Sequence, residues 1–322
     1  MLKKFSFYLM VVAIFAITSC TEYDAQTLKQ MGDSCCIVEN YTEAFKCYEE
    51  SANKGNAYSA RRIGELYEYG TGITKDSIKA IEWYQKAIEL GDTIAIENLA
   101  LCFYRGRDLD KVDEILEKAE SLNYTHAYYR LGEAIFYDDK TKSIEYYEKG
   151  ANLGCKDCAN AVAYMYENAI GCMVNNYQKA VDYYSIAANL GHLDASNSLG
   201  LMYKEGKGVK VDYNKAIELF KLGADKEHLN SMINLGRMYK NGLGVKKDYV
   251  TAVNLYQKAA EKGSHYAIYL LAVAYYNGHG VPKDRNIAYT LFQKSDYDNP
   301  EILEKWDRLT RLTEDRFWWR GF

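Results

Sequence analysis

Between residues 199 and 288 the chain repeats itself every 36 residues, with the same kinds of residue at the same places. Each copy holds a leucine, a tyrosine, a Gly-x-Gly pair, a valine, an aspartate and an alanine. These are Leu199, Tyr203, Gly206, Gly208, Val209, Asp212 and Ala216, then Leu235, Tyr239, Gly242, Gly244, Val245, Asp248 and Ala252, then Leu271, Tyr275, Gly278, Gly280, Val281, Asp284 and Ala288. Such units bury apolar surface only against their neighbours. The pattern predicts a stack of similar units and favours a binding surface over one catalytic centre.

Each copy has the pattern of two helices joined by a glycine turn. Small and apolar residues in 195–203 recur at the spacing of one buried helix face. Gly206 and Gly208 can take the positive φ that ends a helix and reverses the chain. Asp212 is placed to cap the second helix, which carries its apolar residues over 216–224. We expect the tyrosines to fill the space between hairpins.

The motif Ala-x-x-x-Leu-Gly-x-x-Tyr-x-x-Gly-x-Gly-Val-x-x-Asp-x-x-x-Ala, followed by an aromatic residue and Lys-Ala-Ala, resembles the Sel1-like repeat, a relative of the tetratricopeptide repeat. The resemblance implies an all-α fold, a right-handed α/α superhelical solenoid of helical hairpins. It also implies a non-enzymatic protein that binds a protein or peptide partner. No motif in the chain points to a cofactor.

Further copies precede the regular ones, with altered lengths. The intervals 91–123 and 123–154 are shorter and lack the Gly-x-Gly pair, which predicts tighter loops, and the interval 154–191 is one residue longer than the regular period. We count about eight hairpins. The expected organisation is a signal peptide over 1–19, an N-terminal tetratricopeptide-like hairpin over 22–54, Sel1-like repeats over 55–295, and a capping helix with an aromatic tail over 296–322.

The N-terminus has the layout of a secretory signal peptide. Two lysines precede an uncharged apolar run over residues 5–17, which is short for a membrane span. The following Ile17-Thr18-Ser19-Cys20 resembles a bacterial lipobox, which implies lipidation of Cys20 after cleavage. By this resemblance we expect an outer-membrane lipoprotein of the bacterial cell envelope, facing the periplasm or the cell surface. The alternative is ordinary secretion with an incidental Cys20.

The C-terminal segment changes character after Asp296. Residues 301–316 have the pattern of a charged amphipathic helix, and residues 317–322 are rich in aromatic side chains. We expect the helix to cap the last hairpin and the tail to fold onto it. The alternative is an aromatic anchor for a partner or a membrane interface.

Charge argues against a nucleic-acid partner. The net charge is −4, and removal of residues 1–19 takes away Lys3 and Lys4 and no acid, which leaves −6. A mildly acidic chain without basic stripes is a poor binder of phosphate backbones.

Cysteine and histidine spacing points to neither a metal nor a catalytic centre. Seven cysteines besides Cys20 are an odd number for internal pairing. Cys155 and Cys158 have the spacing of half a zinc site or of a redox pair but lack a second pair, so a local disulfide or buried thiols remain open. The histidines recur as parts of the repeat. No catalytic or metal-binding residue is therefore assigned.

One enzymatic alternative rests on Ser51-Ala52-Asn53-Lys54, which fits the Ser-x-x-Lys pattern of penicillin-binding enzymes. It would make the protein a cell-wall-related enzyme or a regulator that interacts with β-lactams. The tetrapeptide falls where other repeats have Ala-Ala-Glu-Lys, and the companion Ser-Asp-Asn and Lys-Thr-Gly motifs are absent from the chain.

By similarity to tetratricopeptide proteins, the first helix of each repeat lines a groove that binds the partner. The candidate groove residues are Arg61, Tyr129, Asn160, Asn197, Arg237 and Tyr269. Guanidinium, amide and phenol groups can hold an extended peptide through hydrogen bonds and stacking. The alternative for each is a solvated helix face.

Overall fold

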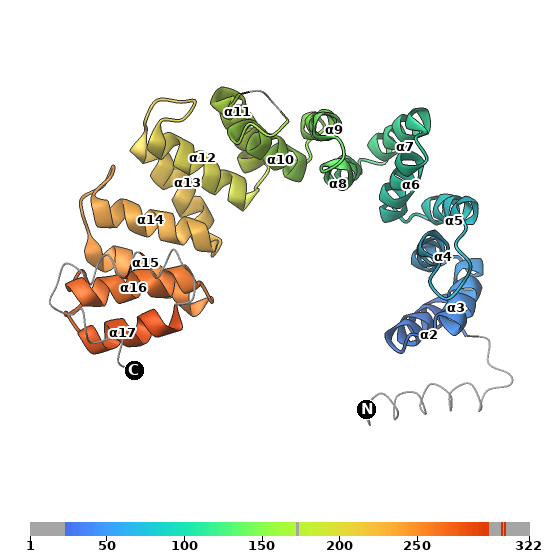
Figure 1. Ribbon diagram of the computed structural model, residues 1–322, viewed down its shortest axis with the longest axis horizontal. Helices are drawn as coiled ribbons and strands as arrows, with labels where there is room; N and C mark the ends of the chain where they lie inside the picture. The colour runs from blue at the N-terminus through green and yellow to red at the C-terminus, as the bar shows by residue number, and fades with distance from the viewer. Residues whose placement is uncertain (1–22, 172–173, 296–303, 305, 307–322) are drawn as a thin grey trace. The chain divides into compact units, whose positions relative to one another are not determined.

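The computed structural model describes residues 23–171, 174–295, 304 and 306, and these residues form helices and no strand (Figure 1). In chain order the helices are α2 (Ala25–Ile37), α3 (Tyr41–Asn53), α4 (Ala57–Tyr69), α5 (Ser77–Glu89), α6 (Ile94–Arg105), α7 (Leu109–Ser121), α8 (His126–Ile135), α9 (Lys140–Asn152), α10 (Lys156–Glu167), α11 (Tyr177–Asn189), α12 (Leu193–Glu205), α13 (Tyr213–Asp225), α14 (Leu229–Asn241), α15 (Tyr249–Glu261), α16 (His265–Asn277) and α17 (Arg285–Lys294).

The helices pair into eight hairpins, which confirms the expected all-α repeat architecture. Even-numbered helices are the first of each pair and odd-numbered helices the second. The chain forms two compact units that meet in sequence between Cys155 and Lys156, with four hairpins in each. Within a unit, the second helix of one hairpin packs on the first helix of the next (Figure 1). The apolar core therefore continues from repeat to repeat.

Each hairpin closes around a small residue of its first helix. In the second hairpin the ring of Tyr84 lies on Gly64, where an added Cβ would sit 2.5 Å from the ring. Gly236 and Tyr256 repeat this contact with the same distance. A methyl group at Gly64 would clash with the ring as it is placed, because the ring rests directly on the helix backbone. The aromatic residue then fills the interior of the hairpin, and Tyr84 is fully buried.

The Gly-x-Gly loops reach back to the preceding repeat. Gly208 has a φ of +68°, and a Cβ there would lie 2.4 Å from the carbonyl oxygen of Tyr177, the first residue of α11. Gly280 contacts Tyr249 at the start of α15 in the same way. Only glycine combines this backbone conformation with so close a contact. Each complete loop therefore covers the N-terminal end of the second helix before it.

The predicted turn and cap residues are confirmed. Gly206 ends α12 in the left-handed conformation with a φ of 73°. Asp212 accepts the backbone N–H of Lys215 at 3.0 Å at the start of α13. The predicted tighter loops are present too, since α6 and α7 are joined by residues 106–108 alone.

Several predicted features lie outside the described residues. These are the signal peptide over 1–19, Cys20, and the cap and tail over 296–322 apart from residues 304 and 306. Trp306 is fully buried and stacks on Phe292 of the last hairpin at 4.4 Å. Of the helices that the structure describes, none is both long and apolar enough to cross a membrane.

Candidate functional site

The predicted groove residues all lie on first helices, on one stripe of the repeat. Five of them stand three residues before the small residue that contacts the aromatic ring. Arg237 stands one residue after Gly236, a helical turn further along the same face. Asn197 and Tyr269 are buried with 7% exposure each, and the other four are half-buried.

Arg61 is held inside the repeat stack. Its guanidinium donates to Asp92 at 2.8 Å and to Glu65 at 2.6 Å, and its side chain is 13% exposed. Asp92 precedes the first helix of the next repeat. The ion pair therefore joins the second hairpin to the third, and two of the guanidinium N–H groups that we expected to face a partner bond within the chain.

A second link of this kind joins hairpins in the other unit. Asn234 donates to Asn197 across the repeat boundary at 2.8 Å, and Arg237 donates to Tyr266 of the following repeat. Tyr129 instead bonds within its own helix, donating to Glu133 at 2.8 Å. The structure thus uses much of this polar stripe to connect neighbouring first helices. A role of these residues in partner binding stays a prediction.

Glu97 belongs to this stripe and was missed in the sequence. It is the counterpart of Arg61 in the third repeat, three residues before Ala100. Its carboxylate, 8% exposed, contacts His126 at 2.9 Å and Arg130 at 3.3 Å in the next hairpin. The alignment of Ala100 with Gly64 would have found it, but this repeat lacks the glycines that set the register elsewhere.

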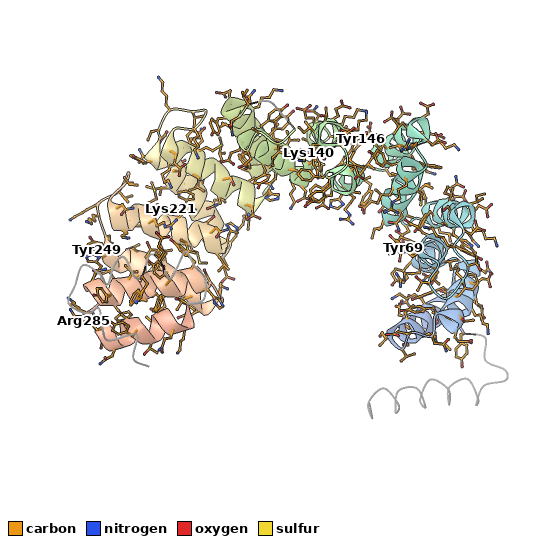
Figure 2. The ribbon with its side chains drawn as sticks, viewed as in Figure 1. Tyr69, Lys140, Tyr146, Lys221, Tyr249 and Arg285 are labelled. Carbon is orange, nitrogen blue, oxygen red and sulfur yellow. The ribbon has the colours of Figure 1, made fainter. Side chains whose placement is uncertain are left out.

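The first unit holds a groove between neighbouring repeats. Two adjoining hollows of about 610 and 460 Å³ lie between α5, α6 and α7, and both are lined by Ile81, Phe103 and Lys111. Tyr69, at the end of α4 and labelled in Figure 2, also lines the first hollow. Ile78 lines the second hollow with 72% of its surface exposed. The result is an apolar floor open to solvent.

The groove exists because the third repeat has a short loop. In the seventh repeat the Gly-x-Gly loop covers Ile217 of α13, which is 4% exposed, and the Cβ of an alanine at Gly244 would lie 3.1 Å from it. Ile81 is the counterpart of Ile217 on α5 and is only half-buried. The loop over it, between Phe103 and Asp108, has four residues fewer than the loop between Tyr239 and Asp248.

Cations surround the first hollow of this groove. Lys75 is exposed and has no ion pair with any described residue, while Lys111 pairs with Asp108 at 3.2 Å and Arg105 with Glu68. Glu82 and Glu114 line the second hollow. Burial raises the pKa of the Cys102 thiol to about 12, so this thiol is an unreactive part of the wall.

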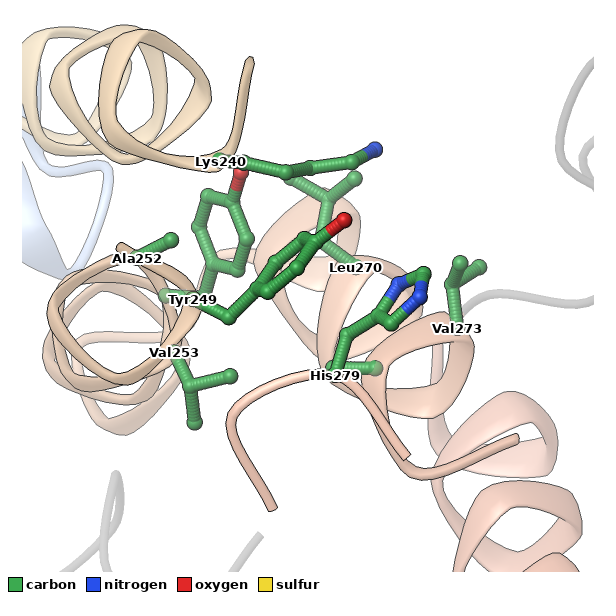
Figure 3. A pocket seen from close by; sticks show the side chains of 9 residues that line it. Lys240, Tyr249, Ala252, Val253, Leu270, Val273 and His279 are labelled. Carbon is green, nitrogen blue, oxygen red and sulfur yellow. The ribbon is translucent and has the colours of Figure 1, made fainter. Parts of the chain in front are cut away.

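The second unit holds a smaller pocket of about 20 Å³ between α14, α15 and α16. Figure 3 shows Lys240 lying across it, with the His279 ring facing Tyr249. The two rings stack with centroids 4.3 Å apart. Tyr256 also lines the pocket, is 2% exposed, and has a hydroxyl without a hydrogen-bond partner.

The residues considered for chemistry are built into the core. Ser51 of the Ser-x-x-Lys pattern is fully buried and donates to the carbonyl of Ala25 at 2.6 Å. Cys155 and Cys158 are buried as well. In the part of the chain that the structure describes, no three His, Cys, Asp or Glu side chains gather into a metal-binding group.

The sequence profile of the Sel1 repeat family matches the chain eight times, over residues 28–56, 57–92, 93–119, 125–155, 156–192, 193–228, 229–264 and 265–295. The first match extends this repeat type into the hairpin that we expected to be only tetratricopeptide-like.

Two curated proteins are similar over part of the chain. The ERAD-associated E3 ubiquitin-protein ligase component HRD3A of Arabidopsis thaliana is 37% identical over 65 residues, 20% of this chain and 10% of its own length. The chitin synthase regulator SKT5 of Saccharomyces cerevisiae is 26% identical over 158 residues, 48% of this chain and 19% of its own length. The matches thus span a small part of either relative.

Solved structures show the same fold. A Sel1 repeat protein from Oxalobacter formigenes has 25% identity and a TM-score of 0.58, covering 90% of this chain and 88% of its own. A protective antigen of uropathogenic Escherichia coli strains with an SLR fold has 24% identity and a TM-score of 0.60, covering 92% and 69%. Both support the repeat solenoid.

Proposed function

From the premise that this chain belongs to the Sel1 repeat family, we propose that it is a scaffold at the bacterial cell envelope that holds a protein partner by a peptide segment. Sel1 repeat proteins are generally protein-interaction scaffolds, and HRD3A is by its name a component of a larger complex. A lipid on Cys20 anchors the scaffold, by the lipobox-like Ile17-Thr18-Ser19-Cys20, as an outer-membrane lipoprotein.

The groove at the third repeat carries the proposal. In complete repeats a loop of the chain itself fills this place with an aliphatic side chain, as Val245 does by packing on the cluster of buried residues that includes Ile217. A partner segment takes the place of that loop over Ile81. It sets an aliphatic side chain on the floor and an acidic side chain beside Lys75 at the cationic end.

The test selects hexapeptides from a random display library on the wild-type protein. The control variant fills the groove from within, with Arg107 replaced by Lys-Gly-Val-Lys-Val, the sequence at residues 207–211. We expect selected peptides to combine an aliphatic and an acidic residue and to bind the filled variant at least tenfold more weakly. Peptides that bind both proteins equally, or that lack the acidic residue, would contradict the proposed groove.

A point variant with a matched control sharpens this test. Ile78→Glu puts a carboxylate on the floor, and we expect it to weaken peptide binding about tenfold. Val250 is the counterpart of Ile78 on α15 and is also exposed, at 56%. Val250→Glu should leave binding unchanged, because the loop at its repeat boundary is complete.

The anchor has its own test. Cells fed a radiolabelled fatty acid should label the wild-type protein, and the label should partition with the outer membrane after fractionation. Cys20→Ala should abolish both. An unlabelled wild-type protein in the soluble fraction would favour ordinary secretion.

A further inference from the structure

A pairing rule between the two helices of a hairpin can be followed through the second, fifth, sixth and seventh hairpins. The residue four positions after the small residue of the first helix faces the aromatic ring of the second. In the second hairpin Tyr84 donates its hydroxyl to Glu68 at this position, at 2.6 Å. In the fifth hairpin Tyr184 donates to Glu167 at 2.8 Å. The buried phenol thus finds a carboxylate acceptor.

The sixth hairpin agrees with this rule, although both residues of the pair differ. A lysine, Lys204, stands at the acceptor position, and the ring opposite is Phe220, which has no hydroxyl to satisfy. Lys204 pairs instead with Glu205 at 3.1 Å. A lysine at this position therefore goes with a ring that needs no acceptor.

The seventh hairpin breaks the rule. Lys240 stands at the acceptor position, but the ring opposite is Tyr256, and its buried hydroxyl has no partner. A buried hydroxyl left without a hydrogen bond destabilises the folded state, because it has given up its bonds to water. Tyr256 lines the small pocket of Figure 3 together with Lys240 and His279, so an acceptor that enters the pocket comes next to this side chain.

The surroundings of this pocket are cationic. Lys240 and His279 line it, and neither Lys240 nor Lys247 has an ion pair with a described residue. Burial lowers the pKa of Lys240, and Arg237 and Lys247 add to the effect. The nearby Asp248 accepts hydrogen bonds from the backbone of α15 and from the Thr251 hydroxyl. A half-buried ammonium without a counter-ion is costly.

We propose that this pocket binds one carboxylate group, which does for Tyr256 what Glu68 does for Tyr84. One carboxylate oxygen accepts the Tyr256 hydroxyl hydrogen, and the other faces the Lys240 ammonium at the mouth. A volume of about 20 Å³ admits a single oxygen atom. The carboxylate comes from an acidic side chain of a partner or from a small free acid. The site lies in the second unit, and its test does not depend on the groove in the first.

The test follows the side-chain NMR signals of Lys240 and His279 while sodium formate replaces sodium chloride at constant ionic strength. We expect a saturable shift and a rise of the His279 pKa, because the bound anion favours the charged imidazole. Tyr256→Phe and Lys240→Gln should each weaken formate binding at least tenfold. Tyr184→Phe, which removes a hydroxyl already paired within the chain, is the matched control and should leave binding unchanged.

Two further measurements test the role of Lys240 and the source of the carboxylate. Lys240→Glu supplies the acceptor from within, so it should abolish formate binding. The peptides Ac-Gly-Glu-Gly-NH2 and Ac-Gly-Gln-Gly-NH2 distinguish the two sources of the carboxylate. If the glutamate peptide binds more tightly than formate, and the glutamine peptide does not, the site takes an acidic side chain of a partner. If formate binds and neither peptide does, the site takes a small free acid. Shifts that never saturate, or that are equal in wild type and Tyr256→Phe, would mean that water fills the pocket and would overturn the proposal.

Discussion

At the scale of single residues, this fold depends on places where one atom decides what fits. The contact of Tyr256 with Gly236 leaves no room for a methyl group. Because the packing is so close, each buried polar atom depends on one particular neighbour for its hydrogen bond. Tyr84 has an acceptor in Glu68, whereas Tyr256 has none. Single substitutions at these positions should therefore have effects that composition alone does not predict.

Gly236→Ala should destabilise the protein. The new Cβ would lie 2.5 Å from the Tyr256 ring. Overpacking of this kind destabilises the folded state by about 1–3 kcal/mol. The better helix propensity of alanine offsets up to about 1 kcal/mol of this loss. We expect a net loss of about 2 kcal/mol in urea unfolding. Gly106→Ala is the control, because its Cβ would meet nothing closer than 3.4 Å. Equal stability of the two variants would contradict the contact.

Acid should weaken the protein partly through His192. Its Nδ1 accepts the N–H of Ala195 at 3.2 Å, and burial lowers its pKa below the usual 6.5 despite the attraction of Asp157. The folded state therefore holds His192 neutral, and stability falls as the pH drops through 6.5 toward the lower folded pKa, where the unfolded chain binds the extra proton. His192→Asn keeps a good cap without titrating. Its urea midpoint should fall less between pH 8 and pH 5 than that of wild type.

At the scale of helices and loops, the Gly-x-Gly loop is the device that connects one repeat to the one before. It covers the start of the previous second helix in complete repeats, with Gly208 against Tyr177. Where the loop is short, as between α6 and α7, the covered surface becomes the groove over Ile81. The loop length therefore decides whether a repeat boundary is closed or open.

Gly208→Ala should open such a boundary. The residue has a φ of +68°, and its Cβ would lie 2.4 Å from a backbone oxygen that cannot turn away. Gly263→Ala carries the same left-handed strain, at a φ of +91°, but has no atom within 4 Å. The control should lose about 1–2 kcal/mol, and Gly208→Ala clearly more. Amide exchange at the start of α11 should also accelerate in Gly208→Ala alone. Equal losses of stability and equal amide exchange in the two variants would contradict the contact between the loop and α11.

At the scale of the whole molecule, the described residues form two units of similar hairpins, and the stability of each unit is built from contacts between neighbouring hairpins. Polar links across repeat boundaries, such as Arg61 with Asp92, supplement the apolar core. A protein of this kind tolerates the loss or gain of a whole repeat better than a change within one repeat.

Deletion of residues 229–264, one complete repeat, should leave a folded protein. The flanking repeats then meet through surfaces like those they already use, because the sixth repeat (193–228) and the deleted seventh share their length and their leucine, tyrosine, glycine and aspartate positions. Deletion of residues 247–264 removes half a hairpin and should abolish cooperative unfolding. Circular dichroism per residue and urea unfolding check both variants. Loss of folding in the full-repeat deletion would show that the seventh repeat is not interchangeable.

The sequence determined by itself the helical hairpins, their number, the glycine turns, the aspartate caps and the shortened loops, because these follow from residues close together in the chain. Only the tertiary structure decided which side chains are left for binding. Arg61 is occupied because Asp92 reaches it from the next repeat, and Ile81 is open because the neighbouring loop is short. Whether Tyr256 has an acceptor depends on how two helices align, which repeat spacing does not contain. Whether a side chain is exposed, and whether a polar atom has a hydrogen-bond partner, depends on its neighbours in space. The order of residues along the chain does not specify those neighbours.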